Sequence, residues 1–185
     1  TFLILDCWDN FEYFKLQPKG KELKAQLPLP VRLVGLRIDK IEKALDSNQV
    51  DIAEREINKL RQQIAALPAE SVIIKEAAAD LARLKEENVW ITLNQDRLEF
   101  LRTHINPLFR TVSEADFKAM RFERDLLEYS LALLGDNKEE QEQAKTLSES
   151  IIEQVSELPL SVPFVKQQED LIRRAQTSYY WHKAD

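Results

Sequence analysis

The sequence is poor in the residues that sheet proteins and disulfide-stabilised domains need. Its 185 residues include only 3 glycines and 1 cysteine. Because sheets usually depend on glycine at their tight turns, the scarcity of glycine favours helices. A single thiol cannot form an internal disulfide, so a reducing, cytoplasmic location is the simplest prediction. Cys7 lies in an apolar run without a histidine or basic cluster beside it, which favours a buried, unreactive thiol.

Long apolar runs are also missing. No stretch approaches the roughly 20 residues that cross a bilayer, and no signal-peptide pattern opens the chain, so we expect no membrane partner. Hydrophobic residues make up 44% and charged residues 31% of the chain, a composition typical of folded domains. The net charge of −6 is uneven, because residues 1–45 carry +2 and residues 46–185 carry −8. Such an acidic body does not suit a primary DNA-binding groove.

Complete catalytic motifs are absent as well. The chain has no phosphate-binding G-x-x-x-x-G-K-[ST] loop, and no Glu follows the apolar run that ends at Asp6 to complete a magnesium site of the kind nucleotide hydrolases use. Glu12 and Lys15 are three residues apart, whereas a carboxylate-and-lysine nuclease centre needs a spacing of two. His104 and His182 lack a second ligand at helical spacing. We therefore expect no catalytic, metal or cofactor site in these 185 residues.

From Pro30 onward, apolar residues recur with the 3.6-residue period of amphipathic helices. Prolines, potential capping residues and Gly135 interrupt this period. The pattern predicts an all-α fold, a bundle of about six to eight helices. The first expected helix carries an apolar stripe through Val31, Val34, Ile38, Ile41 and Leu45, and the second carries one through Ile57 and Leu67. The other expected helices are Ser71–Leu84, Leu98–Ile105, Ser113–Leu134, Asn137–Leu158 and Pro163–Gln176.

The first 29 residues differ from the rest. Residues 1–6 form a continuous apolar run ending in Asp6, which is typical of a buried strand in a parallel sheet. A lone strand is not stable in water, and the chain begins with Thr1, so we expect a piece of a longer protein. The predicted boundary separates residues 1–29, the strand and connector, from a helical domain at 30–185. Basic residues of the connector either contact phosphate or form a solvated face; they are Lys15, Lys19, Lys21 and Lys24.

Helix starts and turns have a similar spacing in two halves of the helical region. Residues 37–40 read Arg-Ile-Asp-Lys and residues 121–124 read Arg-Phe-Glu-Arg. Each half then has a helix start and a Leu-Pro turn at similar spacing, as in a repeated supersecondary unit. We expect two duplicated three-helix units joined by residues 87–112, with Arg37 and Arg121 in matching settings. The alternative is that amphipathic helices resemble one another by chance.

Two pairs of charged residues lie among the apolar stripes. They are Arg37 with Asp39, and Arg121 with Glu123. Residues two apart on a helix do not face each other, so we expect each member to form a structural ion pair with a neighbouring helix or with the other half. Buried pairs of this kind fix register more than they add stability.

Several strings together resemble the C-terminal part of the R subunit of type I restriction enzymes. They are Phe2-Leu-Ile-Leu-Asp-Cys-Trp-Asp-Asn-Phe-Glu-Tyr-Phe14, Pro28-Leu-Pro-Val-Arg-Leu-Val-Gly-Leu-Arg-Ile-Asp-Lys40, Asp116-Phe-Lys-Ala-Met-Arg-Phe-Glu123 and Glu157-Leu-Pro-Leu-Ser-Val162. None is a catalytic motif, so the specificity of the resemblance lies in their number and order.

The resemblance implies a parent protein with a nuclease domain, two RecA-like motor domains that use ATP and Mg, and a C-terminal helical domain. Residues 1–6 would be the last strand of the second motor domain. Residues 30–185 would couple the ATP-dependent translocase and endonuclease to the methyltransferase (M) subunit, and DNA would be bound through the parent chain. The chain itself would not be an enzyme.

The aromatic cluster Tyr179, Tyr180 and Trp181 is the best candidate for an anchor on a protein partner, because Tyr and Trp dominate interface hot spots. Packing within the last helix is the alternative. A second functional hypothesis is a DNA-contacting domain that uses the basic residues from Lys15 to Arg32. A third is the helical arm of an unrelated DEAD-like helicase.

Overall fold

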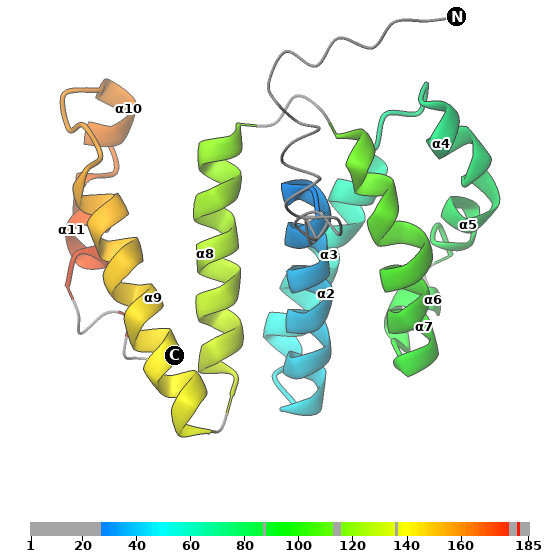
Figure 1. Cartoon of the computed structure of the whole chain (residues 1–185), viewed down its shortest axis with the longest axis horizontal. Coiled ribbons are helices and arrows are strands. Elements are labelled where there is room, and N and C mark those ends of the chain that lie inside the picture. Colours follow the sequence, from blue (N-terminus) through cyan, green and yellow to red (C-terminus); the bar gives the residue numbers. More distant parts are fainter. Residues whose placement is uncertain (1–26, 87, 113–115, 136, 178–180, 182–185) are drawn as a thin grey trace, which may run out of the picture.

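The computed structural model describes residues 27–86, 88–112, 116–135, 137–177 and 181. Within these ranges the secondary structure is entirely helical, with ten α-helices and no strand. Figure 1 shows the helices standing side by side, so the all-α helical bundle is confirmed. The strand predicted at 1–6 and the connector through residue 26 lie outside the described residues, as do Lys15, Lys19, Lys21 and Lys24.

The first half of the bundle runs from residue 29 to residue 111. Its two long helices pack against each other, and a set of short helices follows them. The elements are α2 (Leu29–Asp46), α3 (Val50–Ala65), α4 (Val72–Glu76), α5 (Ala78–Arg83), α6 (Asn88–Ile91), α7 (Gln95–Phe100), the π-helix η1 (Leu101–Ile105) and the 3₁₀-helix η2 (Asn106–Thr111).

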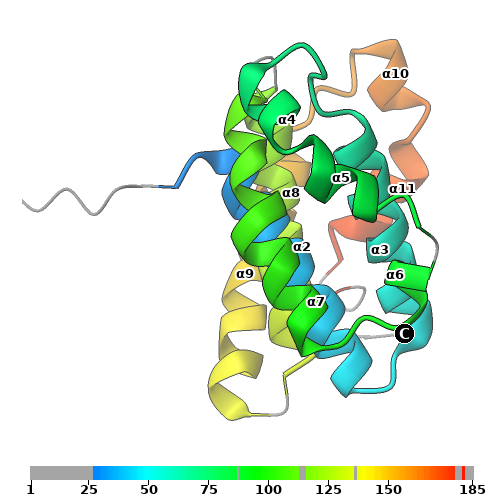
Figure 2. The same ribbon diagram turned by 90° about the vertical axis from the view of Figure 1, so that its right-hand side faces the viewer.

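The second half repeats this order in a shorter form. It consists of α8 (Phe117–Leu133), α9 (Lys138–Ser156), α10 (Pro163–Lys166) and α11 (Glu169–Ala175). Figures 1 and 2 show that α8 stands beside α2, and these two helices form the main contact between the halves. Each half has its own apolar core. None of the described helices is long and apolar enough to cross a membrane.

Helix α2 follows directly from its sequence. Pro30 lies in the first turn, where the missing N–H costs nothing. The predicted stripe is buried at Val31, Val34, Ile38 and Ile41. After Asp46 the chain turns through Asn48, which has a φ of 55°. Asparagine tolerates this left-handed conformation better than most residues, so the turn reverses the chain into α3.

The described residues contain more helices than the six to eight predicted, because two expected helices are broken and α6 was not expected. The segment expected at Ser71–Leu84 divides at Ala77 into α4 and α5. On a straight helix Ile74 and Leu84 would point about 80° apart, but both are buried in the first core. The break lets both side chains reach that core. A similar break near Gln168 divides the expected last helix into α10 and α11.

Two other predicted boundaries are corrected. Asp116, rather than Ser113, caps α8, since its Oδ1 accepts from the backbone N–H groups of Lys118 at 2.9 Å and Ala119 at 3.3 Å. The segment predicted to stop before Pro107 continues as η2 to Thr111. Proline is accepted there because it occupies the first turn of the new helix.

Each half contains a buried tryptophan whose indole N–H donates to a backbone carbonyl six residues earlier. Trp90 Nε1 donates to the carbonyl of Leu84 at 2.8 Å, and Trp181 Nε1 donates to the carbonyl of Ala175. Donor and acceptor are six residues apart in each case, and the two sites are separated by 91 positions. Both indoles are buried. The Leu-Pro turns at Leu67 and Leu158 have the same separation.

The matching of Arg37 with Arg121 does not hold. Arg37 is buried in an ion-pair cluster, whereas Arg121 is exposed. A step of 88 residues takes Arg37, buried in α2, to Asp125, which is buried in α8. The same step takes the buried residues Ile41 and Ala44 to the buried residues Tyr129 and Ala132. The strings at residues 37–40 and 121–124 therefore do not occupy matching positions.

Truncation of the first core should be costly. Ile38 is fully buried in that core, so Ile38→Ala should reduce the free energy of unfolding by about 2–5 kcal/mol through lost transfer energy and a residual cavity. Urea denaturation followed by circular dichroism measures the change. Val50→Ala, at an exposed position, is the control and should change stability by less than about 0.5 kcal/mol. Equal stabilities of the two variants would contradict this core assignment.

Candidate functional site

A cluster of charges, here called the charged seam, lies where α2 meets α3 and α8. It comprises Arg37 and Lys40 of α2, Glu56 and Lys59 of α3, and Glu123 of α8. The side chain of Arg37 is only 1% exposed. Its Nη1 donates to Glu56 and its Nη2 donates to Glu123. One guanidinium thus connects three helices from both halves of the chain.

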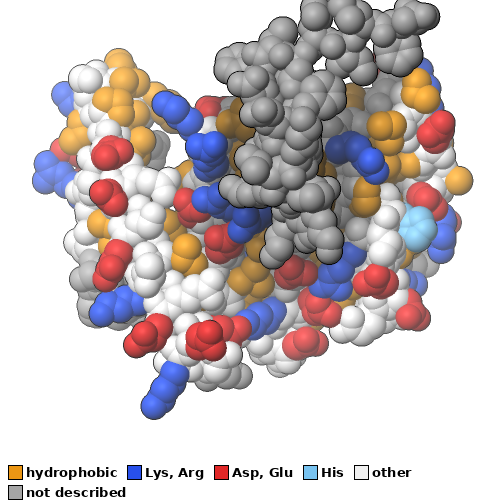
Figure 3. Space-filling model, viewed as in Figure 1, with side chains coloured by type: hydrophobic (Ala, Val, Ile, Leu, Met, Phe, Trp, Pro, Cys, Tyr) orange, Lys and Arg blue, Asp and Glu red, His pale blue; other side chains and the backbone are white. Residues whose placement is uncertain are grey.

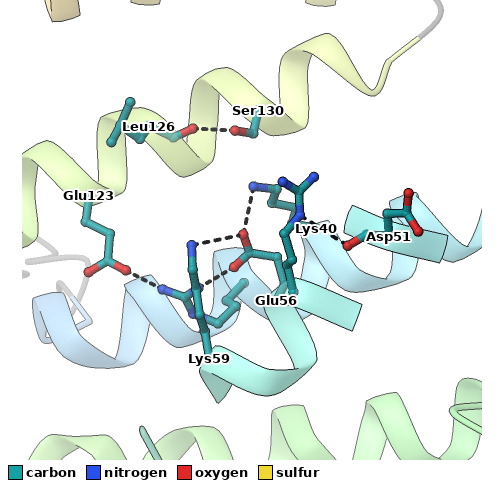
Figure 4. Close-up of polar contacts among 9 residues, drawn as sticks. Lys40, Asp51, Glu56, Lys59, Glu123, Leu126 and Ser130 are labelled. Carbon is teal, nitrogen blue, oxygen red and sulfur yellow. Dashed lines mark hydrogen bonds and ion pairs between the residues drawn. The ribbon is translucent and has the colours of Figure 1, made fainter. Parts of the chain in front are cut away.

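Glu56 is the carboxylate of the seam with the most cationic partners. Lys40 Nζ lies 2.9 Å and Lys59 Nζ 3.5 Å from Glu56 Oε1, and Figure 4 shows both amines directed at this group. Burial acts to raise the pKa of Glu56, but the hydrogen bond from Lys40 and the charges of Lys40, Arg37 and Lys59 leave that pKa below its ordinary value. Glu56 is therefore held ionised and is unsuited to act as a proton donor near neutral pH.

Further ion pairs connect α2 to its neighbours. Arg32 lies 2.6 Å from Glu128 of α8, and Lys43 lies 2.6 Å from Glu140 of α9. Arg102 of η1 lies 2.9 Å from Asp39 and also pairs with Glu42. The Arg102 hydrogen bond lowers the pKa of Glu42, and the Lys43 hydrogen bond lowers that of Glu140. These charges orient helices, and the arrangement indicates a structural role.

The predicted ion-pair residues have different outcomes. Arg37, Asp39 and Glu123 each pair with a neighbouring element, as described above. Arg121 has no ion pair among the described residues, so the prediction does not hold there. The reason is geometric: Arg121 is on an exposed position of α8, and Glu123, two residues further, lies on the side that reaches Arg37.

Trp181 lies in the second core rather than on an open surface. Its ring meets Tyr129 edge-on, with centroids 5.1 Å apart, and the Tyr129 hydroxyl donates to the Trp181 carbonyl. Burial raises the pKa of Tyr129. Trp181 therefore packs within the second core, and the anchor role of the aromatic cluster stays a prediction. Tyr179 and Tyr180 lie outside the described residues.

No metal-binding constellation emerges in the described ranges. They contain no group of three His, Cys, Asp or Glu side chains close enough to hold an ion. His104 stacks on Phe100 with ring centroids 4.9 Å apart, and its Nδ1 lies 2.8 Å from Thr103 Oγ1. His104 therefore contributes to the packing of the η1 segment.

Sequence reasoning missed an apolar surface on the second half. Phe164 is 74% exposed, and Figure 3 shows apolar side chains gathered over the end of the molecule where α10 lies. We call the set the α10 patch; its members are Leu158, Leu160, Val162, Phe164 and Leu171. Helical periodicity gave no signal, because these residues follow the Leu-Pro turn or lie in very short helices.

A wedge-shaped cavity adjoins this patch between α8 and α9. Its volume is about 540 Å³. The α8 wall is formed by Lys118, Ala119, Arg121 and Phe122, and the α9 wall and the turn after it by Gln154, Val155, Glu157 and Leu158. The lining combines apolar and charged side chains, a composition suited to an amphipathic ligand.

Comparisons with protein-family models, with curated proteins and with solved structures found no match.

The charged seam should make stability depend on pH. Because the folded pKa of Glu56 lies below its ordinary value of 4.5, Glu56 contributes stability above that value and loses it as pH falls through the folded pKa. Glu56→Gln leaves Arg37 and two lysines without their shared carboxylate and should cost about 3–5 kcal/mol at pH 7. It should also flatten the loss of stability on acidification. Urea titrations between neutral and acidic pH measure both effects.

Glu54→Gln provides the matched control for this experiment. Glu54 is on the same helix at an exposed position, so its variant should retain the stability and the acid sensitivity of the parent chain. If the Glu56 and Glu54 variants lose stability in parallel as pH falls, the seam is not the source of the pH dependence.

Proposed function

We propose that this chain is the C-terminal helical assembly domain of a type I restriction enzyme R subunit. In this role it couples an ATP-dependent DNA translocase and endonuclease to the methyltransferase core. The parent protein would be cytoplasmic and would use ATP and Mg, whereas the domain itself would be non-catalytic. The proposal starts from the resemblance of four ordered strings of this sequence to that subunit.

The observation that supports a protein-binding role best is the α10 patch. Several exposed apolar residues on one half of a domain are typical of an interaction site. Phe164 and Leu171 are 74% and 55% exposed, so both offer area that a partner would remove from water. Aromatic and aliphatic residues of this kind supply most of the energy of stable interfaces.

The charge distribution supports a protein partner over nucleic acid. Residues 46–185 carry a net charge of −8, which repels a phosphate backbone. Arg32, a member of the proposed basic stretch, already pairs with Glu128 at 2.6 Å. Its charge is therefore partly neutralised within the domain.

We also infer that the two halves are copies of one unit. The two Trp–carbonyl bonds, the Leu-Pro turns and the paired short helices support this inference. Buried Arg37 and buried Asp125 occupy matching positions, and each bonds to the following long helix, through Glu56 and Gln154 respectively. Stacked copies would give the domain an extended surface, as in other repeat proteins.

Copurification tests the assembly role. The methyltransferase subunit of the same restriction system should copurify with this chain and remain bound in moderate salt, because apolar contact dominates the proposed interface. The double variant Phe164→Ser with Leu171→Ser should reduce the retained methyltransferase at least about tenfold. Ile91→Ser, which removes an equally exposed apolar residue from the first half, is the control and should leave retention unchanged.

Two results would contradict the proposal. One is DNA binding by the chain with a steep salt dependence and no methyltransferase retention, which would assign a nucleic-acid role. The other is ATP hydrolysis by these 185 residues alone, measured as phosphate release.

A further inference from the structure

We propose that a cavity in the first half, enclosed by α3, α4, α5 and α6, binds a small anion that has an apolar body and one charged head group. The volume of this cavity is about 430 Å³, which lies within the range of about 300–1,000 Å³ that is typical of small-molecule sites. The inference goes beyond the assembly role and does not depend on it, because every lining residue of this cavity belongs to the first half.

The floor of the cavity is apolar and is fixed by the first core. Leu67, Ile74 and Leu84 line it, and all three are buried members of that core. Trp90 lines it too, and its Nε1 donates to the carbonyl of Leu84 at 2.8 Å. The guanidinium of Arg61 lies over the Trp90 ring, 5.9 Å from its centroid. These contacts hold the wall in place before a ligand arrives, and a preorganised wall lowers the cost of binding.

The space itself comes from a broken helix and from small side chains. Because the chain divides at Ala77 into α4 and α5, residues of both short helices line the same cavity. A methyl side chain leaves volume unfilled where a longer side chain would occupy it. The lining contains four alanines, at Ala65, Ala69, Ala78 and Ala82.

The second half carries longer side chains at the corresponding positions of its broken helix. The separation of 91 positions between the two buried tryptophans takes Ala78 to Glu169 and Ala82 to Arg173. Glu169 and Arg173 form an ion pair at 2.7 Å. The alanines of α5 are therefore particular to the first half, and a broken helix of this kind does not require them.

The charge of the lining indicates the sign of the ligand. The described residues that line the cavity include three cations, Arg61, Lys75 and Lys85, and no carboxylate, although residues 46–185 carry a net charge of −8. In the described part of the chain Lys85 is exposed and has no ion pair. Lys75 pairs with Glu70 at 3.0 Å, but the Glu70 side chain is 95% exposed. Such a surface pair contributes little, so both lysines can turn to an anionic head group while the apolar body lies on the floor.

Octanoate is a suitable probe, because it combines an apolar chain with one carboxylate. Isothermal titration calorimetry with the 185-residue chain should show saturable binding at one site, with a Kd below about 1 mM. Octanol has the same apolar chain without the charge. It should bind at least about threefold more weakly, since it gains nothing from the lysines.

The lysines are tested by the double variant Lys75→Gln with Lys85→Gln. This variant should weaken octanoate binding at least about threefold and leave octanol binding unchanged. Lys138→Gln with Lys145→Gln is the control, because it removes the same charge from exposed positions of α9 and should leave both affinities as they are.

The cavity is tested by filling it. Ala78→Leu should weaken the binding of octanoate and of octanol at least about tenfold, because the added side chain occupies the space of the ligand. Ala79→Leu is the matched control, since Ala79 is the next residue of α5 and is also exposed but does not line the cavity. Ala82→Leu repeats the test at a second lining position.

Three results would overturn the proposal. Absence of saturable octanoate binding would remove the site. Binding that persists in both Ala78→Leu and Ala82→Leu would place the ligand elsewhere on the chain. Equal affinity for octanoate and octanol would remove the preference for an anion.

The same probe distinguishes this cavity from the proposed assembly surface. If octanoate releases a copurified methyltransferase subunit, the cavity belongs to the protein interface and the small-molecule assignment is overturned. If octanoate binds through Ala78 while the methyltransferase does not copurify, the cavity assignment stands and only the restriction-enzyme role is removed.

Discussion

Arg37 is a cation with almost no access to solvent, held between Glu56 of the following helix and Glu123 of the second half. Burying an unpaired charge costs several kcal/mol, so α2, α3 and α8 must remain in the arrangement that keeps both carboxylates beside the guanidinium. The remaining ion pairs of α2 act in the same direction, joining it to α8, α9 and η1. Charge pairs therefore help to fix the relation between the two halves, each of which has its own apolar core.

This division explains why a compact helical domain can still expose apolar surface. In the first half, η1 and η2 return over α2, where η1 contacts α5 and η2 contacts α4. The second half has the same sequence of long helix, long helix and broken helix, but in the described ranges nothing returns over it. Its Leu-Pro turn and α10 present Leu158, Leu160 and Phe164 to solvent.

The arrangement is consistent with a role in assembly, as proposed above. Carboxylates that would be candidates for acid–base chemistry in another protein are held ionised here by Lys and Arg partners, as the lowered pKa values of Glu42, Glu56 and Glu140 indicate. The apolar surface of the second half remains to interact with other molecules.

The sequence by itself determined that the described residues are helical and where α2, α3 and α9 run, because the apolar period is a local property of the sequence. It also indicated that Arg37, Asp39 and Glu123 pair with other elements, because residues two apart on a helix do not face each other. Only the tertiary structure decided that two predicted helices are each divided, into α4 and α5 and into α10 and α11. The break at Ala77, for example, lets Ile74 and Leu84 reach one core. The tertiary structure also decided that Arg121 faces outward and Trp181 inward. These outcomes depend on which helices lie opposite each residue, and spacing along one chain does not encode that.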